Sequence, residues 1–445
     1  SWRGADVQNI LDFQKDYPKT KTIKLEQNYR STKTIISAAN AVIDNNTDRP
    51  AKRLWTDNDA GVRIRHYAAA DEHDEADFIV EVMKKEHADT SYGDMAVLYR
   101  MNAQSRVLEE SLVRQGIAYT MVGGTRFYDR AEIKDILAYL RVIENPRDDV
   151  SLKRIINVPR RGIGAATVEK LEEYANASGQ SLFEAVLASS ESGIAGAAGR
   201  KLQEFSALLF GFLNLLADND IFTLITRILE DTKYVPALHE NRDPQAQSRE
   251  ENLGELLSVA QDFQRETPNG TLADFLEKAA LVNDTDTYEN EDDKVTLMTM
   301  HSAKGLEFPV VFLAGMDEGI FPGVRSLMDE TQLEEERRLC YVGITRAKEK
   351  LYLSNASMRT MYGMAKAYMP SRFLQEIPED LMEEAKWKNG SGRSERYRQR
   401  GLDRAQSKYA VSSAAQSGNS REKGRRAARF DGKKGEKVRN MTGGV

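Results

Sequence analysis

The sequence is poor in cysteine and histidine. Its 445 residues include one cysteine, Cys340, and five histidines scattered along the chain. One cysteine cannot form a disulfide within the chain, so the composition is typical of a reducing compartment, and we expect a cytoplasmic location. The histidines lack the spacing of metal ligands, and we therefore predict no metal site in this chain. Cys340 lies among apolar residues of a predicted helix, which indicates a core position.

Long apolar runs are also absent. The longest mostly apolar stretch runs from Ala207 to Ala217, which is too short to cross a bilayer. No secretory signal pattern is visible at the start of the sequence. We therefore expect no contact with a membrane.

A phosphate-binding loop of the pattern G-x-x-x-x-G-K-[ST] occurs nowhere in the 445 residues. Asp317 and Glu318 follow an apolar segment and resemble the acidic pair that holds Mg²⁺ in proteins with such a loop. Because the loop is absent, we do not assign them that role. By itself the chain is expected to hydrolyse no nucleotide.

Charge is distributed unevenly along the chain, whose net charge is −6. Residues 381–445 contain seventeen Lys or Arg and seven Asp or Glu, a net of +10, which leaves −16 for the rest. This segment has too few apolar residues to offset the entropy lost on ordering. We predict a disordered basic tail that holds nucleic acid nonspecifically or serves as a linker.

Alternating strand and helix patterns predict an α/β domain with a parallel sheet, in two parts, residues 22–124 and 287–380. The predicted strands are 22–25, 63–67, 95–99, 119–122, 294–300, 309–316 and 350–354. The predicted helices between them are 33–44, 71–87, 103–115 and 334–342.

Residues 125–286 show helical spacing and no convincing strand, which predicts an all-α insertion into the sheet domain. Its clearest helices are 131–144, 151–157, 166–178, 200–219, 222–231 and 247–265. Residues 284–293 hold six acidic side chains in ten positions, and we interpret them as a solvated hinge that leads back to the sheet.

Charged residues follow the predicted strands 294–300 and 309–316. Ligands of open α/β sheets bind at the carboxyl edge, and we expect His301, Lys304 and Glu307 to lie there. Arg346 stands in a turn beside the strand 350–354, where its guanidinium could bind phosphate. The alternative is that Arg346 pairs with the acids at 334–336, and the spacing alone does not decide between them.

Two stretches carry a resemblance to a known family. They are KVTLMTMHSAKGLEFPVVFLAGMDEG at 294–319 and EEERRLCYVGITRAKEKLYLS at 334–354. They resemble motifs V and VI of the superfamily 1A DNA helicases, the UvrD/Rep group, and the likeness spans most of residues 1–378. It implies that 1–21 end domain 1A and its linker, that the sheet is the RecA-like domain 2A, and that 125–286 form domain 2B.

The resemblance implies a nucleotide site on one wall of a cleft between two RecA-like domains. In the pattern L-x-x-N-Y-R-S, Tyr29 would stack on adenine and Arg30 would reach the γ-phosphate, and Arg346 would be the second catalytic arginine. Gly305 would let the backbone approach the nucleotide, and Glu307 would accept a hydrogen bond from the ribose. A buried, paired carboxylate is the structural alternative for Glu307.

The resemblance also implies contacts with single-stranded DNA. Trp2, with Arg3 beside it, matches the end of motif III, where the tryptophan stacks on a base, although a core aromatic is the ordinary interpretation. Thr299 and His301 would couple DNA to the nucleotide cleft. Tyr362 falls on an aromatic position of the DNA channel.

A duplex contact is expected in the helical insertion. The loop around Arg161, Gly162 and Gly164 resembles the helix-hairpin-helix-like element that the family places on duplex DNA. Glycine–apolar–glycine before a helix exposes backbone N–H groups to an anion, and arginine adds charge. The alternative is an ordinary corner between two helices.

Together these features imply the C-terminal half of an ATP-dependent 3′–5′ DNA helicase and translocase of DNA repair and replication. ATP and Mg²⁺ would be its cofactors, with the Mg²⁺ ligands in a preceding half. Its partners would be single-stranded DNA, the junction with duplex, and repair proteins or RNA polymerase through the C-terminal region. The alternatives are a helicase-type subunit of a nuclease complex and a DNA-binding fragment without enzymatic activity.

Overall fold

The computed structural model describes residues 13, 16, 17, 19–21, 23–47, 53–218, 220–240, 243–283 and 293–386. Several predictions fall outside these residues. They are the predictions for Trp2 and Arg3, most of the linker 1–21, most of the acidic segment 284–293, and the basic tail beyond 386.

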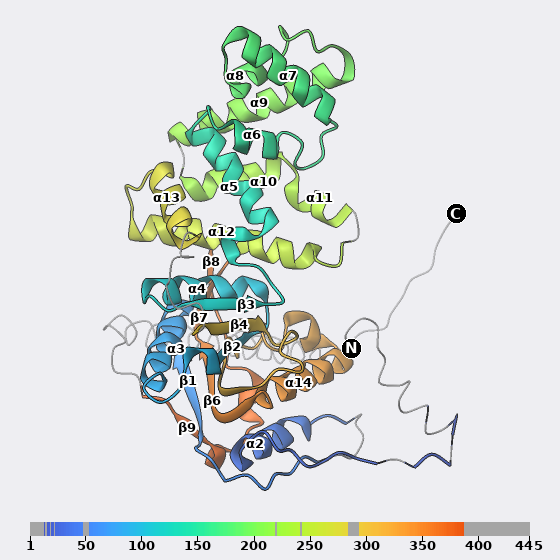
Figure 1. The fold of residues 1–445 in the computed structure, drawn as a ribbon, viewed down its shortest axis with the longest axis vertical. Helices are drawn as coiled ribbons and strands as arrows, with labels where there is room; N and C mark the ends of the chain where they lie inside the picture. The colour runs from blue at the N-terminus through green and yellow to red at the C-terminus, as the bar shows by residue number, and fades with distance from the viewer. Residues whose placement is uncertain are drawn as a thin grey trace, which may run out of the picture. The chain divides into compact units, whose positions relative to one another are not determined.

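One sheet of seven parallel strands organises the first and last thirds of the described chain (Figure 1). Its order is β3-β4-β2-β5-β6-β1-β9. The strands are β1 Ile64–Ala69, β2 Met95–Tyr99, β3 Tyr119–Val122, β4 Val295–Thr299, β5 Phe308–Leu313, β6 Ala347–Ala356 and β9 Met382–Glu384. The prediction of a parallel α/β sheet assembled from two chain segments is confirmed.

Helices cover both faces of the sheet. On one face lie α2 Lys33–Ile43, α14 Glu330–Ile344 and α15 Arg372–Gln375, and on the other lie α3 Glu72–Glu86 and α4 Ser105–Arg114. Ala96 and Leu98 of β2 pack with the first group, whereas Met95, Val97 and Tyr99 pack with the second. This double burial explains why the strands are continuous apolar runs.

The structure corrects two sequence predictions at the edges of the sheet. Residues 23–25 form no strand, and Ile23 and Leu25 are 72% and 80% exposed, because both sheet edges are formed by other segments, β3 and β9. Conversely, β9 lies inside the segment predicted to be a tail from residue 381. It pairs with β1 in parallel register, Ile64 opposite Met382. Three residues are too short a run to show an apolar period in the sequence.

Between β3 and β4 the described chain contains helices and no strand, as predicted. They are α5 Ala131–Glu144, α6 Asp149–Ile155, α7 Ala165–Ser178, α8 Leu182–Leu187, α9 Gly196–Asp218, α10 Ile221–Asp231, α11 Tyr234–Glu240, α12 Ala246–Glu266 and α13 Leu272–Asn283. The sequence did not predict α8, α11 and α13. These helices bury a core of their own, separate from the two cores of the sheet. The domain boundaries at 125 and 286 stay a prediction.

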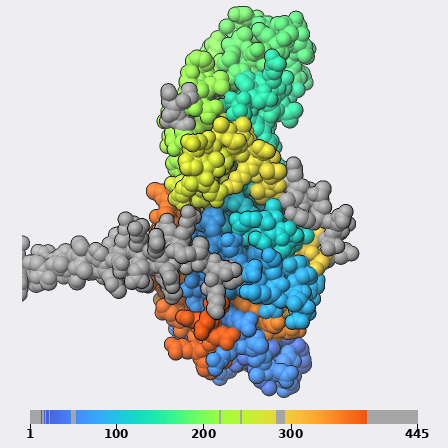
Figure 2. All heavy atoms as spheres, turned by 90° about the vertical axis from the view of Figure 1, so that its left-hand side faces the viewer, coloured from blue at the N-terminus to red at the C-terminus, as the bar shows by residue number. Residues whose placement is uncertain are grey.

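Buried charges join the helical insertion to the sheet domain. Arg106 of α4 is 1% exposed, and its Nε lies 2.5 Å from Glu255 Oε1 of α12. Its Nη2 lies 3.3 Å from Asp262 Oδ2, which also contacts His73 of α3. Figure 2 shows the yellow surface of the α12–α13 region resting on the blue and cyan surface of the sheet domain. Removing one member of such a buried ion set typically costs about 3–5 kcal/mol.

A β-hairpin adds a second junction between the two parts. It consists of β7 Met358–Met361 and β8 Met364–Ala367, and both turn residues, Tyr362 and Gly363, have positive φ of 54° and 70°. Ser258 Oγ of α12 accepts a hydrogen bond from Gly363 N at 3.2 Å. A Cβ at Gly254 of α12 would lie 2.4 Å from the Tyr362 ring, so the absent side chain makes room for the tyrosine.

Two further expectations can be compared with the described residues. Cys340 is fully buried in the core beneath α14, as predicted, and burial raises the pKa of its thiol. None of the helices in the described part of the chain has the length and apolar character that a membrane span requires.

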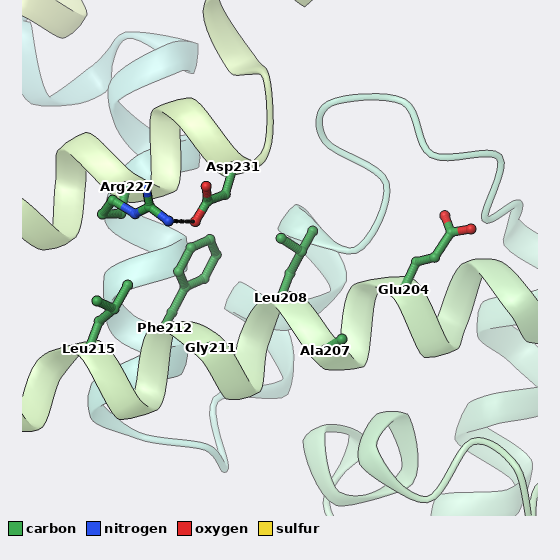
Figure 3. Close-up of a pocket in the computed structure, with 8 residues that line it drawn as sticks. All are labelled: Glu204, Ala207, Leu208, Gly211, Phe212, Leu215, Arg227 and Asp231. Carbon is green, nitrogen blue, oxygen red and sulfur yellow. Dashed lines mark ion pairs between the residues drawn. The ribbon is translucent and has the colours of Figure 1, made fainter.

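The close approach of Tyr362 to Gly254 can be tested with a matched pair of helical glycines. Alanine in a helix interior is favoured over glycine by about 1 kcal/mol. Gly211 of α9 lines an open groove of about 570 Å³ and would take a Cβ with no heavy atom within 4 Å (Figure 3). We expect Gly211→Ala to stabilise the protein, and Gly254→Ala to be less stable than Gly211→Ala by roughly 1–3 kcal/mol, the typical cost of overpacking. Urea unfolding measures the free energy of unfolding of both variants. If the two variants are stabilised equally, the β7–β8 hairpin shifts without energetic cost to accommodate the new methyl group.

The pair of His73 with Asp262 predicts a pH-dependent stability. Burial disfavours the charged imidazole, but the hydrogen bond with Asp262 and the negative charges of Asp262 and Glu72 together outweigh this effect, so the pKa of His73 is raised above 6.5. Because the folded-state pKa is the higher one, the stabilisation is fully present below pH 6.5 and is lost as the pH rises through the folded value. We expect the free energy of unfolding of the wild type to fall above pH 6.5 relative to His73→Asn. Urea midpoints between pH 6 and 9 measure this difference, and parallel curves for the two proteins would contradict the assignment.

Candidate functional site

Four charged side chains from distant parts of the sequence meet at the amino ends of β5 and β6. Glu307 immediately precedes β5, and Arg346 immediately precedes β6. Arg30 arrives from the loop before α2, and its Nε lies 2.5 Å from Glu307 Oε2. Lys348 Nζ lies 3.0 Å from Glu307 Oε1. We call Arg30, Glu307, Arg346 and Lys348 the charged cluster.

Side-chain and backbone hydrogen bonds hold the Arg30 loop in shape and against the start of β6. The Asn28 side chain accepts from the backbone N–H groups of Arg30 and Ser31, both at 2.9 Å, which closes a tight turn. Ser31 Oγ is buried and donates to Ala347 O at 2.6 Å. Thr32 N donates to Lys348 O at 3.1 Å. These bonds fix the Arg30 backbone before any ligand binds.

Arg346 is held by uncharged oxygen atoms. Its Nη1 donates to Leu306 O and its Nε to Val342 O, both at 3.0 Å. The acids at 334–336 do not hold it, since Glu336 pairs with Arg100 at 2.8 Å and Glu334 accepts from Thr47 at 2.9 Å. Burial and the nearby cation of Arg30 lower the pKa of Arg346. The two arginines therefore lie within electrostatic reach of each other.

Glu307 is the acidic member of the charged cluster. Its side chain is 41% exposed, so it is not the buried carboxylate that the sequence left as an alternative. Hydrogen bonds from Lys348 and Arg30 lower its pKa. Three cations and one carboxylate make the cluster cationic.

Tyr29 and Gly305 border this cluster in the way an open ligand site requires. The Tyr29 side chain is 78% exposed, and its OH donates to Gln27 Oε1 at 2.7 Å. Gln27 Nε2 in turn donates to Asp57 Oδ2 at 3.0 Å. Gly305 has a φ of +94°, which favours glycine, and the space that its Cβ would occupy is open.

One sequence expectation about the site is wrong. His301, Lys304 and Glu307 were expected together at the carboxyl edge of the sheet. The structure places His301 just beyond the carboxyl end of β4 and Glu307 at the amino end of β5. Because β4 and β5 run in the same direction, the segment between them must return from one edge to the other.

Thr299 and His301 lie at the carboxyl edge, away from Glu307. The Thr299 and Ser302 hydroxyls are 3.1 Å apart, and Ser302 N donates to Thr299 O at 3.0 Å. His301 is exposed, and its packed surroundings together with the cation of Arg100 lower its pKa. His301 is therefore predominantly neutral at neutral pH and can both donate and accept a hydrogen bond.

Tyr362 lies apart from these residues, at the tip of the β7–β8 hairpin. Its side chain is 38% exposed, and its ring occupies the space above Gly254 of α12. The aromatic ring therefore contacts the helical insertion while part of it stays open to solvent.

The loop before α7 uses its two arginines differently. The Arg161 guanidinium donates to Ile155 O at 2.8 Å and to Val158 O at 3.0 Å, and it also bonds the Tyr139 hydroxyl. It satisfies carbonyls at the end of α6 and is not free to bind a phosphate in this structure. Arg160 is exposed instead. Sequence spacing could not distinguish the two neighbours.

Gly162 and Gly164 keep the loop open at the start of α7. Gly162 has a φ of +79°, and neither glycine has a heavy atom within 4 Å of the position of a Cβ. Gly164 is the residue that precedes the first turn of α7, in extended conformation. The backbone there is accessible to a ligand.

The sequence analysis missed Asn28 and Lys348. Asn28 lies inside the stretch that carries Tyr29 and Arg30, so its turn-forming type was an available signal. Lys348 gave no local signal, because its partner Glu307 is distant in sequence. As for metals, no group of three or more His, Cys, Asp or Glu side chains in the described ranges could hold an ion.

Comparisons with known proteins identify the family of the chain. The family model described as "UvrD-like helicase C-terminal domain" matches residues 23–192 and 213–358. "ATP-dependent DNA helicase PcrA" of Bacillus subtilis (strain 168) is 49% identical over 390 residues, which cover 86% of this chain and 53% of that protein. The proteins of the same name from Staphylococcus epidermidis and Staphylococcus aureus are 49% and 48% identical, with the same coverage. The chain spans about half the length of the curated relatives it matches.

The different uses of Arg160 and Arg161 predict different effects on stability. Arg161→Ala removes several charge-assisted hydrogen bonds and leaves carbonyls without partners, so we expect a loss of about 2 kcal/mol or more. Arg160→Ala removes an exposed side chain and should change stability by less than about 0.5 kcal/mol. Urea unfolding of the two variants measures this contrast. If both variants lose the same free energy of unfolding, the hydrogen bonds of Arg161 make no net contribution to stability.

Proposed function

The chain belongs to the UvrD-like helicase family, and on that premise we propose that it is the C-terminal part of an ATP-dependent DNA helicase. The whole protein would translocate 3′ to 5′ on single-stranded DNA and act in repair and replication. The chain would supply one wall of the ATP cleft and part of the DNA track.

The convergence of Arg30 and Arg346 is the observation that carries this proposal. Each comes from a different part of the sequence. Arg30 Nη1 donates a hydrogen bond to Thr345 O at 3.2 Å, next to Arg346 in the chain, and the cation of Arg30 helps to lower the pKa of Arg346. Glu307 supplies one negative charge beside the two guanidinium groups and Lys348, so the remaining positive charge favours the binding of a further anion. A triphosphate is the anion that fits two forked donors, and arginines at a γ-phosphate stabilise the charge of the transition state.

The neighbours of the two arginines suit the rest of a nucleotide. Tyr29 offers an exposed ring for stacking on adenine. Glu307, ionised and exposed, can accept a hydrogen bond from a ribose hydroxyl, and Gly305 leaves the backbone accessible. We propose Tyr29, Arg30, Gly305, Glu307 and Arg346 as the nucleotide-binding residues of this chain, with both arginines catalytic.

Single-stranded DNA would bind at the opposite edge of the sheet. Thr299 and His301 lie there, and the segment that follows them leads directly to Glu307. A shift of this segment on nucleotide binding would be transmitted to the DNA side. Tyr362, together with Trp2 and Arg3 outside the described residues, would contribute base stacking and phosphate contacts.

Duplex DNA would bind the helical insertion at the start of α7. The accessible backbone at Gly162 and Gly164 and the exposed Arg160 support a phosphate contact, with Arg161 holding the loop in shape. Such contacts are independent of base sequence, as a translocating protein requires.

The rest of the catalytic machinery would come from elsewhere in the longer protein. ATP hydrolysis needs a phosphate-binding lysine and Mg²⁺, and neither a phosphate loop in the sequence nor an acidic cluster in the described residues provides for them. The isolated chain should bind DNA weakly and turn over no ATP. Binding of repair proteins or RNA polymerase through the C-terminal region would involve residues outside the described ones.

The arginine assignment can be tested in the full-length protein. We expect Arg346→Ala to lower kcat for ATP about 10³-fold or more, because a catalytic arginine acts chiefly on the transition state. Affinity for single-stranded DNA should survive, since the proposed DNA residues lie at the other edge of the sheet. Arg114→Ala, which removes an exposed arginine paired with Asp77 at 2.5 Å, is the matched control and should keep kcat. A kcat near wild type in Arg346→Ala would refute the assignment.

A further inference from the structure

Each carboxylate oxygen of Glu307 is held by a different cation. Oε2 accepts from Arg30 Nε at 2.5 Å, and Oε1 lies 3.0 Å from Lys348 Nζ. Two cations on two oxygens define both the position and the plane of the carboxylate. All three side chains are partly exposed, at 24%, 41% and 36% for Arg30, Glu307 and Lys348.

The two cations are not equivalent once a nucleotide binds. Arg30 is one of the two arginines proposed to contact the γ-phosphate, and the γ-phosphate dianion competes with Glu307 for its guanidinium. Lys348 is not among the residues proposed to contact the phosphates, and its Nζ contacts Glu307. When Arg30 turns to the phosphate, Lys348 remains to keep Glu307 ionised and oriented.

The register between β5 and β6 is irregular at the point where Lys348 stands. Phe308 pairs with Ala347, but Val310 pairs with Lys350, so two steps along β5 correspond to three along β6. The extra residue lies between Ala347 and Lys350, where Lys348 stands. Such bulges change the direction in which a side chain points and are frequent beside active sites.

We propose that Lys348 is a positioning residue that holds Glu307 against the nucleotide ribose and thereby sets the discrimination against a nucleotide that lacks the contacted ribose hydroxyl. This inference rests on the proposed function. A site that hydrogen-bonds a hydroxyl rejects an analogue without it, but only if the acceptor is correctly placed. With Lys348 absent, Glu307 would follow Arg30 toward the phosphate or turn into solvent, and the ribose hydroxyl would lose its acceptor.

The experiment uses the full-length protein and steady-state ATP turnover in the presence of single-stranded DNA. Values of kcat and KM are measured for ATP, 2′-deoxy-ATP and 3′-deoxy-ATP. Lys348→Met keeps the aliphatic stem and removes the charge, and Lys348→Arg restores a cation. Lys350→Met is the matched control, because Lys350 lies on the same strand and pairs with a different glutamate, Glu86, at 2.5 Å.

We expect Lys348→Met to raise the KM for ATP roughly threefold to tenfold, the effect of one weakened charge-assisted hydrogen bond. The KM for the deoxy analogue that lacks the contacted hydroxyl should change little, so its ratio to the KM for ATP falls toward one. The value of kcat should change less than about twofold, because the arginines stay in place. Lys348→Arg should recover most of the ratio, and Lys350→Met should keep it.

Three results would overturn the role of Lys348. The first is a ratio of the KM for the deoxy analogue to the KM for ATP that is unchanged in Lys348→Met. The second is an equal rise of KM for all three nucleotides, which would mean that Lys348 only attracts the negative charge of the nucleotide. The third is a wild type that does not distinguish ATP from either deoxy analogue. In contrast, a wild type without DNA-stimulated ATP turnover, or an Arg346→Ala variant with normal kcat, would contradict the proposed function itself.

Discussion

All seven strands of the sheet run in the same direction, and the charged cluster depends on this constraint. Each connection must return from the carboxyl edge to the amino edge, so β5 and β6 both begin at the amino edge, β5 after the short segment 300–307 and β6 after a longer connection. Phe308 N bonds to Arg346 O at 3.0 Å, which places the residues before the two strands side by side. Ser31, bonded to the start of β6, then adds Arg30 to the same place. The same direction of the strands puts Thr299 and His301 at the far end of β4, with one short segment joining the two edges.

The charged cluster differs from an ordinary surface ion-pair network because its positive and negative charges are not equal in number. Three cations share one carboxylate, and Arg346 is held by carbonyl groups that do not neutralise it. Such an excess of positive charge, fixed by backbone hydrogen bonds before a ligand arrives, favours a multiply charged anion and needs little rearrangement to bind it. Elsewhere in the sheet domain, buried arginines such as Arg359 are fully paired, with Asp317 at 2.7 Å and with Glu75 at 2.6 Å. That contrast separates the proposed site from the structural ion pairs.

The helix that attaches the helical insertion to the sheet domain, α12, also contacts one of the proposed DNA-binding residues. Arg106, Glu255 and Asp262 form a buried ionic contact between α4 and α12. The hairpin that carries Tyr362 rests on the same helix, α12, next to Gly254. A base that stacks on Tyr362 would therefore meet a ring whose position depends on the insertion. The proposed DNA contact and the attachment of the insertion would therefore share α12.

The sequence by itself determined the parallel α/β class, the helical insertion, most element boundaries and the motif residues, because these depend on local periodicity and on residue types close together in the chain. It also indicated that Arg30 and Arg346 belong to one site, through family resemblance. Only the tertiary structure decided which edge of the sheet holds Glu307, which of Arg160 and Arg161 is exposed, that residues 382–384 join the sheet, and that Lys348 contacts Glu307. Each of these depends on strand direction or on partners far apart in the sequence, and neither leaves a local pattern.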